Sequence, residues 1–222
     1  MNHELETSVR PDTKEKILDV AERLFATHGF PATSLRQITA EAGVNLAAVN
    51  YHFRSKEALL SAVLQRRLGP VNARRLELLE QARQNARDGK LVLEDVIRAF
   101  IQPVYEARGA GIELGHFARL IVRVATDQDD WAISVMREQM QSTIARFLPL
   151  FTGALGAGDP STVAMAMQLT MGAMAHSMKP APILDSLVGV DLKTLPPAEH
   201  LERLICYAAG GMRALAERER SR

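Results

Sequence analysis

The 222-residue sequence predicts an all-α fold, with an N-terminal three-helix helix-turn-helix domain joined by a linker helix to a larger helical domain. Residue types that favour helices dominate the composition, namely Ala, Leu, Met, Glu, Gln and Arg. Apolar residues recur at the spacing of one helix face, i, i+3, i+4 and i+7. Long alternations of β-branched and polar residues, typical of strands, are missing, so we expect no sheet.

The first expected helix follows a polar N-terminal arm, residues 1–11. Asp12 and Glu15 resemble an N-cap pair at its start, and His28-Gly29 ends it. Its apolar stripe consists of Ile17, Val20, Ala21, Leu24 and Phe25. We expect this stripe to pack beneath the helices that follow.

Two short helices separated by a tight turn are expected next, between residues 33 and 60. Ser34 and Gln37 form a capping box at the start of the first, and Gly43 suits the left-handed residue that ends it. Asn45 suits the N-cap of the second helix. That helix is expected to be anchored by the apolar stripe Leu46, Val49 and Phe53.

The opposite face of the second short helix combines small residues with hydrogen-bonding side chains: Ala47, Ala48, Asn50, Tyr51 and His52. Alanine lets a helix approach base edges and touch a thymine methyl, and asparagine can pair bidentately with adenine. Tyrosine and histidine can reach phosphate oxygens. We therefore interpret this helix as a DNA recognition helix.

The predicted DNA-binding residues are Thr33, Gln37, Asn45, Ala47, Ala48, Asn50, Tyr51, His52 and Lys56. Tyr51, His52 and Lys56 are expected at phosphates or base edges. Asn45 is expected to read bases or, alternatively, only to cap its helix. Thr33, with Gln37, is expected to position the DNA backbone, with a turn role as the alternative. Phosphates could also bind at the helix N-termini that follow Ser34 and Ser55.

Several motifs in the first third of the chain, beyond the stripe of residues 17–25, match a known pattern: Gly29-Phe30, Thr33-Ser34-Leu35, Ile38, Ala42-Gly43-Val44, Tyr51-His52-Phe53 and Lys56-Glu57-Ala58-Leu59. These motifs resemble the TetR family of transcriptional regulators. More narrowly, residues 43–53 followed by Leu68-Gly69-Pro70 are similar to members that respond to long-chain fatty acids or their acyl-CoA esters. The resemblance implies a repressor that a hydrophobic effector releases from a palindromic operator.

The linker helix is expected to begin at Ser55 and to be kinked or broken at Gly69-Pro70 before ending near Asp88-Gly89. We predict a DNA-binding domain at residues 12–58 and an effector-binding and dimerisation domain at residues 59–222. Within the larger domain, a helix from Leu93 should break near Pro103 or Tyr105. Further helices are expected at residues 112–126, 129–151, 161–178 and 197–218, with a long proline-containing loop at residues 179–196.

The helices at residues 161–178 and 197–218 are predicted to form a four-helix homodimer seam, two helices from each chain. The first offers small residues, Ala164, Ala166, Gly172, Ala173 and Ala175, and the second offers Leu201, Leu204, Ile205, Ala208, Ala209 and Met212. A dimer would present two recognition helices about 34 Å apart to successive major grooves. The alternative is that both helices are buried within one chain.

An effector site is predicted in the larger domain, with the residues Phe100, Phe117, Arg119, Arg123, Met171 and Met174. His116 shares a helix face with Arg119 and Arg123. This stripe is either a solvated surface or a site for a carboxylate or acyl-CoA phosphate. The many methionines and aromatic residues either pack a core or wall a tunnel for an aliphatic chain.

The remaining features restrict the class of protein. No metal-ligand or catalytic motif is present, so we expect neither an enzyme nor a cofactor. With Cys206 as the single cysteine and a polar N-terminus, a cytoplasmic location is expected, and residues 163–178 are too short to span a membrane. The net charge of +1 means that any DNA contact must use local charge. Two alternatives stay open: a helical acyl-ligand-binding protein without DNA binding, and a TetR-like regulator of drug efflux.

Overall fold

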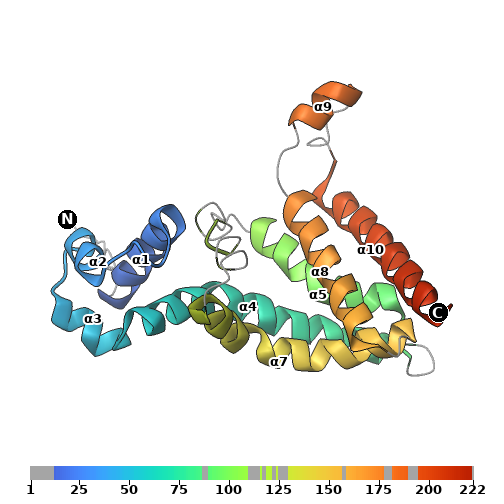
Figure 1. The fold of residues 1–222 in the computed structure, drawn as a ribbon, viewed down its shortest axis with the longest axis horizontal. Helices are drawn as coiled ribbons and strands as arrows, with labels where there is room; N and C mark the ends of the chain where they lie inside the picture. Colours follow the sequence, from blue (N-terminus) through green and yellow to red (C-terminus); the bar gives the residue numbers. More distant parts are fainter. Residues whose placement is uncertain are drawn as a thin grey trace, which may run out of the picture. The chain divides into compact units, whose positions relative to one another are not determined.

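The computed structural model describes residues 13–86, 90–109, 116, 119–121, 124, 130–156, 159–177, 182–189 and 195–221 (Figure 1). These residues form helices and connecting turns, with no strand among them, which confirms the all-α prediction. The helices are α1 (Thr13–His28), α2 (Leu35–Ala42), α3 (Leu46–Phe53), α4 (Lys56–Asn85), α5 (Leu93–Gly109), α7 (Asp130–Leu155), α8 (Pro160–Ser177), α9 (Pro182–Val188) and α10 (Pro197–Arg220).

By its internal packing the chain divides into two compact units. The first unit comprises Met1–Pro70 and Glu113–Met140, and the second comprises Val71–Ile112 and Gln141–Arg222. A segment from the C-terminal half of the sequence therefore belongs to the same unit as the three N-terminal helices. The domain boundary predicted after residue 58 would instead place this segment in the larger domain.

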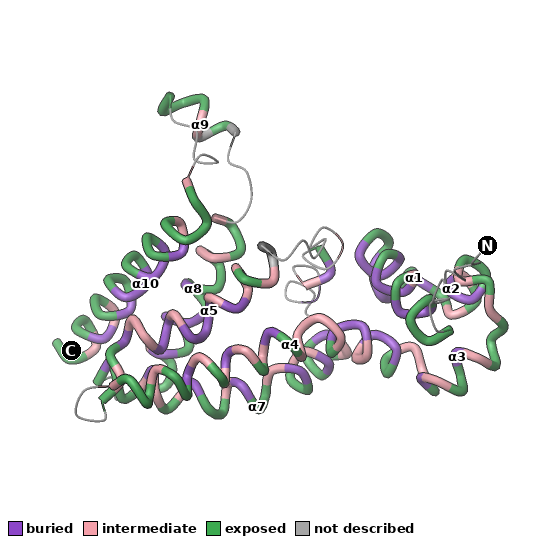
Figure 2. The backbone as a smooth tube through the Cα atoms, turned by 180° about the vertical axis from the view of Figure 1, so that it is seen from behind, coloured by how far each residue is buried: buried purple, intermediate pink, exposed green. Residues whose placement is uncertain are grey.

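The core of the first unit is built from the apolar stripes of α1, α2, α3 and the start of α4, because helices bury one face (Figure 2). In α1 the stripe is buried as predicted, except that Val20 is half-buried. The later segment contributes four buried residues to this core: Leu120, Val124, Ala132 and Val135. The N-terminal helices therefore pack around side chains that come from the distant segment.

The second unit is centred on α10, which packs against α5 and α8. The residues that were predicted to form the dimer seam from α10 are buried within the chain: Leu201, Leu204, Ile205, Ala208, Ala209 and Met212. Figure 2 shows this buried stripe along one side of α10 and exposed residues along the other. A contact between chains through α10 must therefore use its other face.

Prolines lie inside two of the helices. The helix α4 continues through Pro70, which excludes a break there but not the predicted kink, whereas α5 continues through Pro103 and does not break there as predicted. A proline inside a helix costs about 3 kcal/mol, but buried neighbours such as Val71, Phe100 and Ile101 stabilise the continuous helices. The expected loop at residues 179–196 contains the short helix α9.

The helix α7 is longer than predicted, and the described residues of the expected helix at residues 112–126 agree with the prediction. The helix α7 extends to Leu155, beyond the predicted end at residue 151. In the range 112–126, residues 116, 119–121 and 124 are described, and all are helical. The expected N-cap residue Asp12 lies outside the described residues.

Candidate nucleic-acid interface

The turn between α2 and α3 is held by caps that the sequence predicted. The Ser34 Oγ accepts a hydrogen bond from the Gln37 N–H at 3.1 Å, and the Asn45 Oδ1 accepts one from the Ala48 N–H at 2.8 Å. Gly43 ends α2 with a φ of 66°, a left-handed conformation that glycine adopts without steric cost. These local bonds satisfy N–H groups that would otherwise be unpaired at the helix ends.

The predicted recognition helix α3 buries two of the three apolar side chains that were expected to anchor it. Val49 and Phe53 are buried, with exposed fractions of 0% and 5%, whereas Leu46 is 41% exposed. Side chains lean toward the N-terminus of their helix, so a residue in the first turn extends past the packed turns. Ala48 takes part in the anchoring and packs half-buried against the core.

The outer face of α3 exposes most of the predicted set. Tyr51 is 84% exposed, Ala47 and Asn50 are also exposed, and His52 is half-buried. The Tyr51 and His52 rings meet edge to face, with centroids 5.1 Å apart. The exposed Tyr51 side chain presents both an apolar ring and a hydroxyl to an outside partner.

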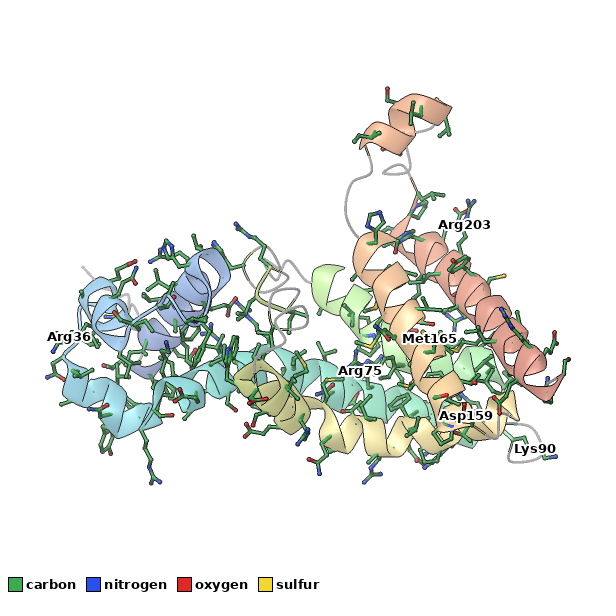
Figure 3. All side chains as sticks on the ribbon, in the orientation of Figure 1. Arg36, Arg75, Lys90, Asp159, Met165 and Arg203 are labelled. Atoms are coloured by element: carbon green, nitrogen blue, oxygen red, sulfur yellow. The ribbon has the colours of Figure 1, made fainter. Side chains whose placement is uncertain are left out.

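Two arginines that the sequence interpretation missed extend this surface. Arg36 is exposed on α2 (Figure 3), and Arg54 is exposed directly after α3. No ion pair involves either guanidinium within the described part of the chain. Neither arginine belongs to a periodic pattern, so only their exposure beside α3 identifies them as candidate phosphate ligands.

Thr33 and Lys56 make contacts inside the protein. The Thr33 side chain is buried, and its Oγ1 donates to the Gly29 carbonyl at 2.7 Å and to the Leu24 carbonyl at 3.3 Å. The Lys56 Nζ donates to the carbonyls of Phe30 and Thr33, both at 2.9 Å. Both side chains therefore stabilise the α1–α2 turn, which for Thr33 is the alternative role considered above.

A buried carboxylate joins α1 to α4. Glu22 is 4% exposed and accepts hydrogen bonds from Arg66 Nη2 at 2.7 Å and from Arg67 Nε and Nη2, both at 3.0 Å. Arg66 also binds Glu15 and Asp19 on α1. We refer to Glu22, Arg66 and Arg67 as the α1–α4 clamp.

A cavity of about 290 Å³ lies beside this clamp. It is lined by Asp19, Val20, Glu22, Arg23, Arg67 and His116. His116, from the predicted basic stripe, is half-buried and lines this cavity together with charged residues of α1 and α4. The lining is too polar for an aliphatic chain.

Of the predicted effector residues, four are among those the structure describes: Phe100, Arg119, Met171 and Met174. Phe100 is buried in the second unit, where its ring centroid lies 5.2 Å from that of Phe147, whereas Arg119 is an exposed residue of the first unit. Met171 is exposed and Met174 half-buried on α8. The side chains of Phe117 and Arg123 lie outside the described residues.

The interior of the second unit is closed around Phe100. The space between α5, α7, α8 and α10 is too narrow to admit a water molecule. Arg75 enters this interior from α4 (Figure 3), and its Nε donates to the Phe100 carbonyl at 2.8 Å. Burial lowers the pKa of Arg75 to about 10, so the group is still charged at neutral pH.

Within the described ranges, His, Cys, Asp and Glu side chains nowhere gather in threes in a way that could hold a metal ion. Every described helix is too short or too polar to cross a lipid bilayer.

Two family models match the chain. Residues 17–63 match the model for "Bacterial regulatory proteins, tetR family". Residues 98–211, about half of the chain, match the "Tetracyclin repressor-like, C-terminal domain". The two matches cover most of the helices described above.

Curated relatives are similar over part of their length. The transcriptional regulator AcrR of Shigella flexneri is 36% identical over 97 residues, which is 44% of this chain and 44% of AcrR. The transcriptional repressor KstR2 of Rhodococcus jostii (strain RHA1) is 29% identical over 156 residues, 69% of this chain and 68% of KstR2. The chain thus spans less than half the length of AcrR in this match.

Solved structures share the fold at low sequence identity. The fatty acid degradation regulator FadR from Bacillus halodurans is 15% identical, with a TM-score of 0.59 over 92% of this chain and 98% of FadR. A TetR-family regulator from Bordetella parapertussis 12822 is 14% identical, with a TM-score of 0.59 over 90% of this chain and 95% of that chain. Because the C-terminal model covers about half of the chain and the N-terminal model covers the helix-turn-helix, the chain belongs to the TetR family of bacterial regulatory proteins.

Proposed function

We propose that this chain is a homodimeric repressor that reads a palindromic operator through the outer face of α3 and is released by a hydrophobic acyl effector. The observation that carries the operator part is the exposure of Tyr51, at 84%, on a helix whose other face is anchored by Val49 and Phe53. Ala47 and Asn50 lie beside it and would face base edges. DNA binding is assigned to residues 12–58 and effector binding to the larger domain.

The phosphate contacts of the proposed complex come from the rim of this surface. Arg36 and Arg54 are added to the predicted Tyr51 and His52, because both guanidiniums are exposed. The Lys56 ammonium donates two of its three N–H groups to carbonyls inside the protein. We assign it a role in holding the α1–α2 turn, and its third N–H group would donate to a phosphate. Asn45 caps α3, and Gln37 lies in the first turn of α2, where its side chain can position the DNA backbone.

The proposed dimer seam uses the outer faces of α8 and α10, within the predicted ranges of residues 161–178 and 197–218. The helix α8 contains no Lys, Arg, Asp or Glu, and it exposes Met165, Leu169 and Met171. On α10, Tyr207 is 72% exposed. Uncharged apolar surface of this kind is typical of a contact between chains.

Two observations support an acyl effector. Residues 43–53 are similar to fatty-acid-responsive regulators, and the chain shares its fold with a regulator named for fatty acid degradation. The ligand would enter the interior around Phe100, where the narrow space between α5, α7, α8 and α10 must widen to hold it. A thermal-shift screen with oleate, palmitoyl-CoA and hydrophobic drugs tests this. A ligand at 100 times its Kd adds about 2.7 kcal/mol to the free energy of unfolding, and stabilisation by drugs alone would favour the efflux alternative.

The operator assignment is tested with a duplex selected by the protein from a random-sequence pool. Tyr51→Ala should weaken binding of this duplex at least tenfold, with the helix content by circular dichroism unchanged. Tyr51→Phe keeps the ring and removes only the hydroxyl, so it should lose less affinity than Tyr51→Ala and measures the contribution of the phosphate hydrogen bond. Failure of the wild-type protein to select any duplex would favour the acyl-binding protein without DNA binding, and unaltered affinity of Tyr51→Ala would remove Tyr51 from the site.

A further inference from the structure

Trp131, near the start of α7, stacks on a residue of the DNA-binding unit. Its indole lies against the Phe30 ring, with ring centroids 4.4 Å apart and planes inclined by 27°. Phe30 is 6% exposed and occupies the turn that connects α1 to α2. A residue 101 positions later in the sequence thus packs against the turn from which the helix-turn-helix begins.

Phe30 is also the contact point of Lys56, the first residue of α4. The Lys56 Nζ lies 4.3 Å from the centroid of the Phe30 ring, within the range of a cation–π interaction. The same ammonium donates hydrogen bonds to the carbonyls of Phe30 and Thr33. Trp131, Phe30 and Lys56, which we call the aromatic joint, therefore connect α7, the α1–α2 turn and α4.

Neighbouring residues fix the start of α7 in the first unit. Gln139 Nε2 donates to the Ser61 Oγ at 3.0 Å, and the Ser61 hydroxyl donates to Glu138 at 2.9 Å. Ala132 and Val135 are buried in the same core. The later residues of α7 belong to the second unit, whose core contains Phe147 and Phe151. One helix thus contributes side chains to the cores of both units.

We infer that Trp131 is a positioning residue for operator binding: through Phe30 and Lys56 it sets the turn from which α2 and α3 start. This inference rests on the proposed operator-binding function. Van der Waals contact weakens within about 1 Å of separation, so a shift of α7 that parts the two rings would release the turn. The recognition helix would then lose its orientation while the fold of the unit is retained.

The test compares Trp131→Leu with Trp131→Phe in the full-length protein. The measured quantity is the ratio of the affinities for the selected duplex and for a scrambled duplex of equal length. Trp131→Leu should lower this ratio about tenfold, because phosphate contacts persist while base contacts are misplaced. Trp131→Phe, which keeps a ring on Phe30, should stay within about twofold of the wild type.

A role of Trp131 in stability alone gives a different result. Below the melting temperature of the variant, a purely destabilising change lowers both affinities by the same factor and leaves their ratio unchanged. In a double-mutant cycle, Trp131→Leu and Phe30→Leu should be non-additive, since both remove one stacking contact. An unchanged ratio in Trp131→Leu, or additive effects in the cycle, would overturn the inference.

Trp131 is the only tryptophan of the chain, so its fluorescence reports on the joint directly. Its emission should change when the wild-type protein binds the selected duplex. If the wild-type protein selects no duplex, the proposed function fails and the inference with it. If it selects one but the emission stays constant and Trp131→Leu keeps the wild-type affinity ratio, only the inference fails.

Discussion

Arg54, at the C-terminal end of α3, combines an exposed guanidinium with an unusual backbone conformation. Its φ is 64° and its ψ is −38°, a region that residues with a Cβ rarely occupy. Its N–H still donates to the Asn50 carbonyl at 3.2 Å, so the end of the helix is capped. A strained residue at the edge of the proposed DNA-binding surface is consistent with a functional role for its side chain.

Replacing Arg54 by glycine should have opposite effects on stability and on binding. Glycine accepts a positive φ, so Arg54→Gly should raise the free energy of unfolding by about 1 kcal/mol in urea denaturation. It should also weaken operator binding. The slope of log Kd against log salt concentration should fall by about 1, as expected when one phosphate contact is lost. Arg54→Ala, which keeps the Cβ, should lose affinity without gaining stability, and equal salt slopes for all three proteins would contradict the assignment.

At the scale of secondary-structure elements, the α1–α4 clamp ties the N-terminal helix to the linker helix. The buried carboxylate of Glu22 is shared by Arg66 and Arg67, whose side chains are 20% and 28% exposed. Removing one partner of a buried charged pair is costly, because the remaining charge stays out of water and no longer has an opposite charge beside it. The clamp therefore fixes the packing of α1 against α4.

Glu22→Gln should destabilise the first unit by roughly 3 kcal/mol, since two partly buried guanidiniums would face a neutral amide. Chemical denaturation followed by circular dichroism measures the loss. Glu15→Gln is the control, because the Glu15 side chain is 50% exposed and its ion pair within the described residues is with Arg66, so its loss should cost less than about 1 kcal/mol. Equal effects of the two variants would show that burial of Glu22 carries no special cost.

Across the second unit, two arginine–glutamate pairs bridge α5 and α10. Glu94 accepts two hydrogen bonds of 2.7 Å from Arg213, and Glu202 pairs with Arg98. The hydrogen bonds from these guanidiniums lower the pKa of Glu94 and of Glu202 below the ordinary value of 4.5. A carboxylate with a lowered pKa stabilises the folded state above its unfolded pKa, and this stabilisation is lost as the pH falls through the folded value.

The double variant Glu94→Gln and Glu202→Gln should therefore be less sensitive to acid than the wild type. The difference in melting temperature between the two proteins should be present at pH 6 and should shrink as the pH falls from about 5 toward 3. Each pair is partly exposed, so its contribution should not exceed about 1 kcal/mol. Parallel pH profiles of the two proteins would contradict the role of these pairs.

For the whole molecule, the proposed dimer depends on the uncharged outer face of α8. Leu169, 57% exposed in the single chain, lies on this face. Leu169→Glu should produce monomers in sedimentation velocity and weaken operator binding, because burying an unpaired carboxylate in the seam is unfavourable. Val92→Glu, at a position 56% exposed outside α8 and α10, is the control and should remain dimeric. A dimeric Leu169→Glu protein would place the seam elsewhere.

The features that the sequence alone determined are those that depend on neighbours a few residues apart. The α1 stripe follows from helical periodicity, and the caps formed by Ser34, Gly43 and Asn45 follow from backbone groups within four residues. The outer face of α3 was predicted for the same reason. Local interactions of this kind can be read from spacing, and they were enough to predict the all-α fold and the candidate recognition helix.

Only the tertiary structure decided which distant segments meet. The placement of Trp131 against Phe30, the carbonyl partners of Lys56 and the burial of Glu22 between two arginines all join residues more than 20 positions apart. The continuity of α4 through Pro70 likewise depends on packing that outweighs a local preference. Such contacts depend on how complete helices pack together, and helical periodicity does not specify which buried face packs against which.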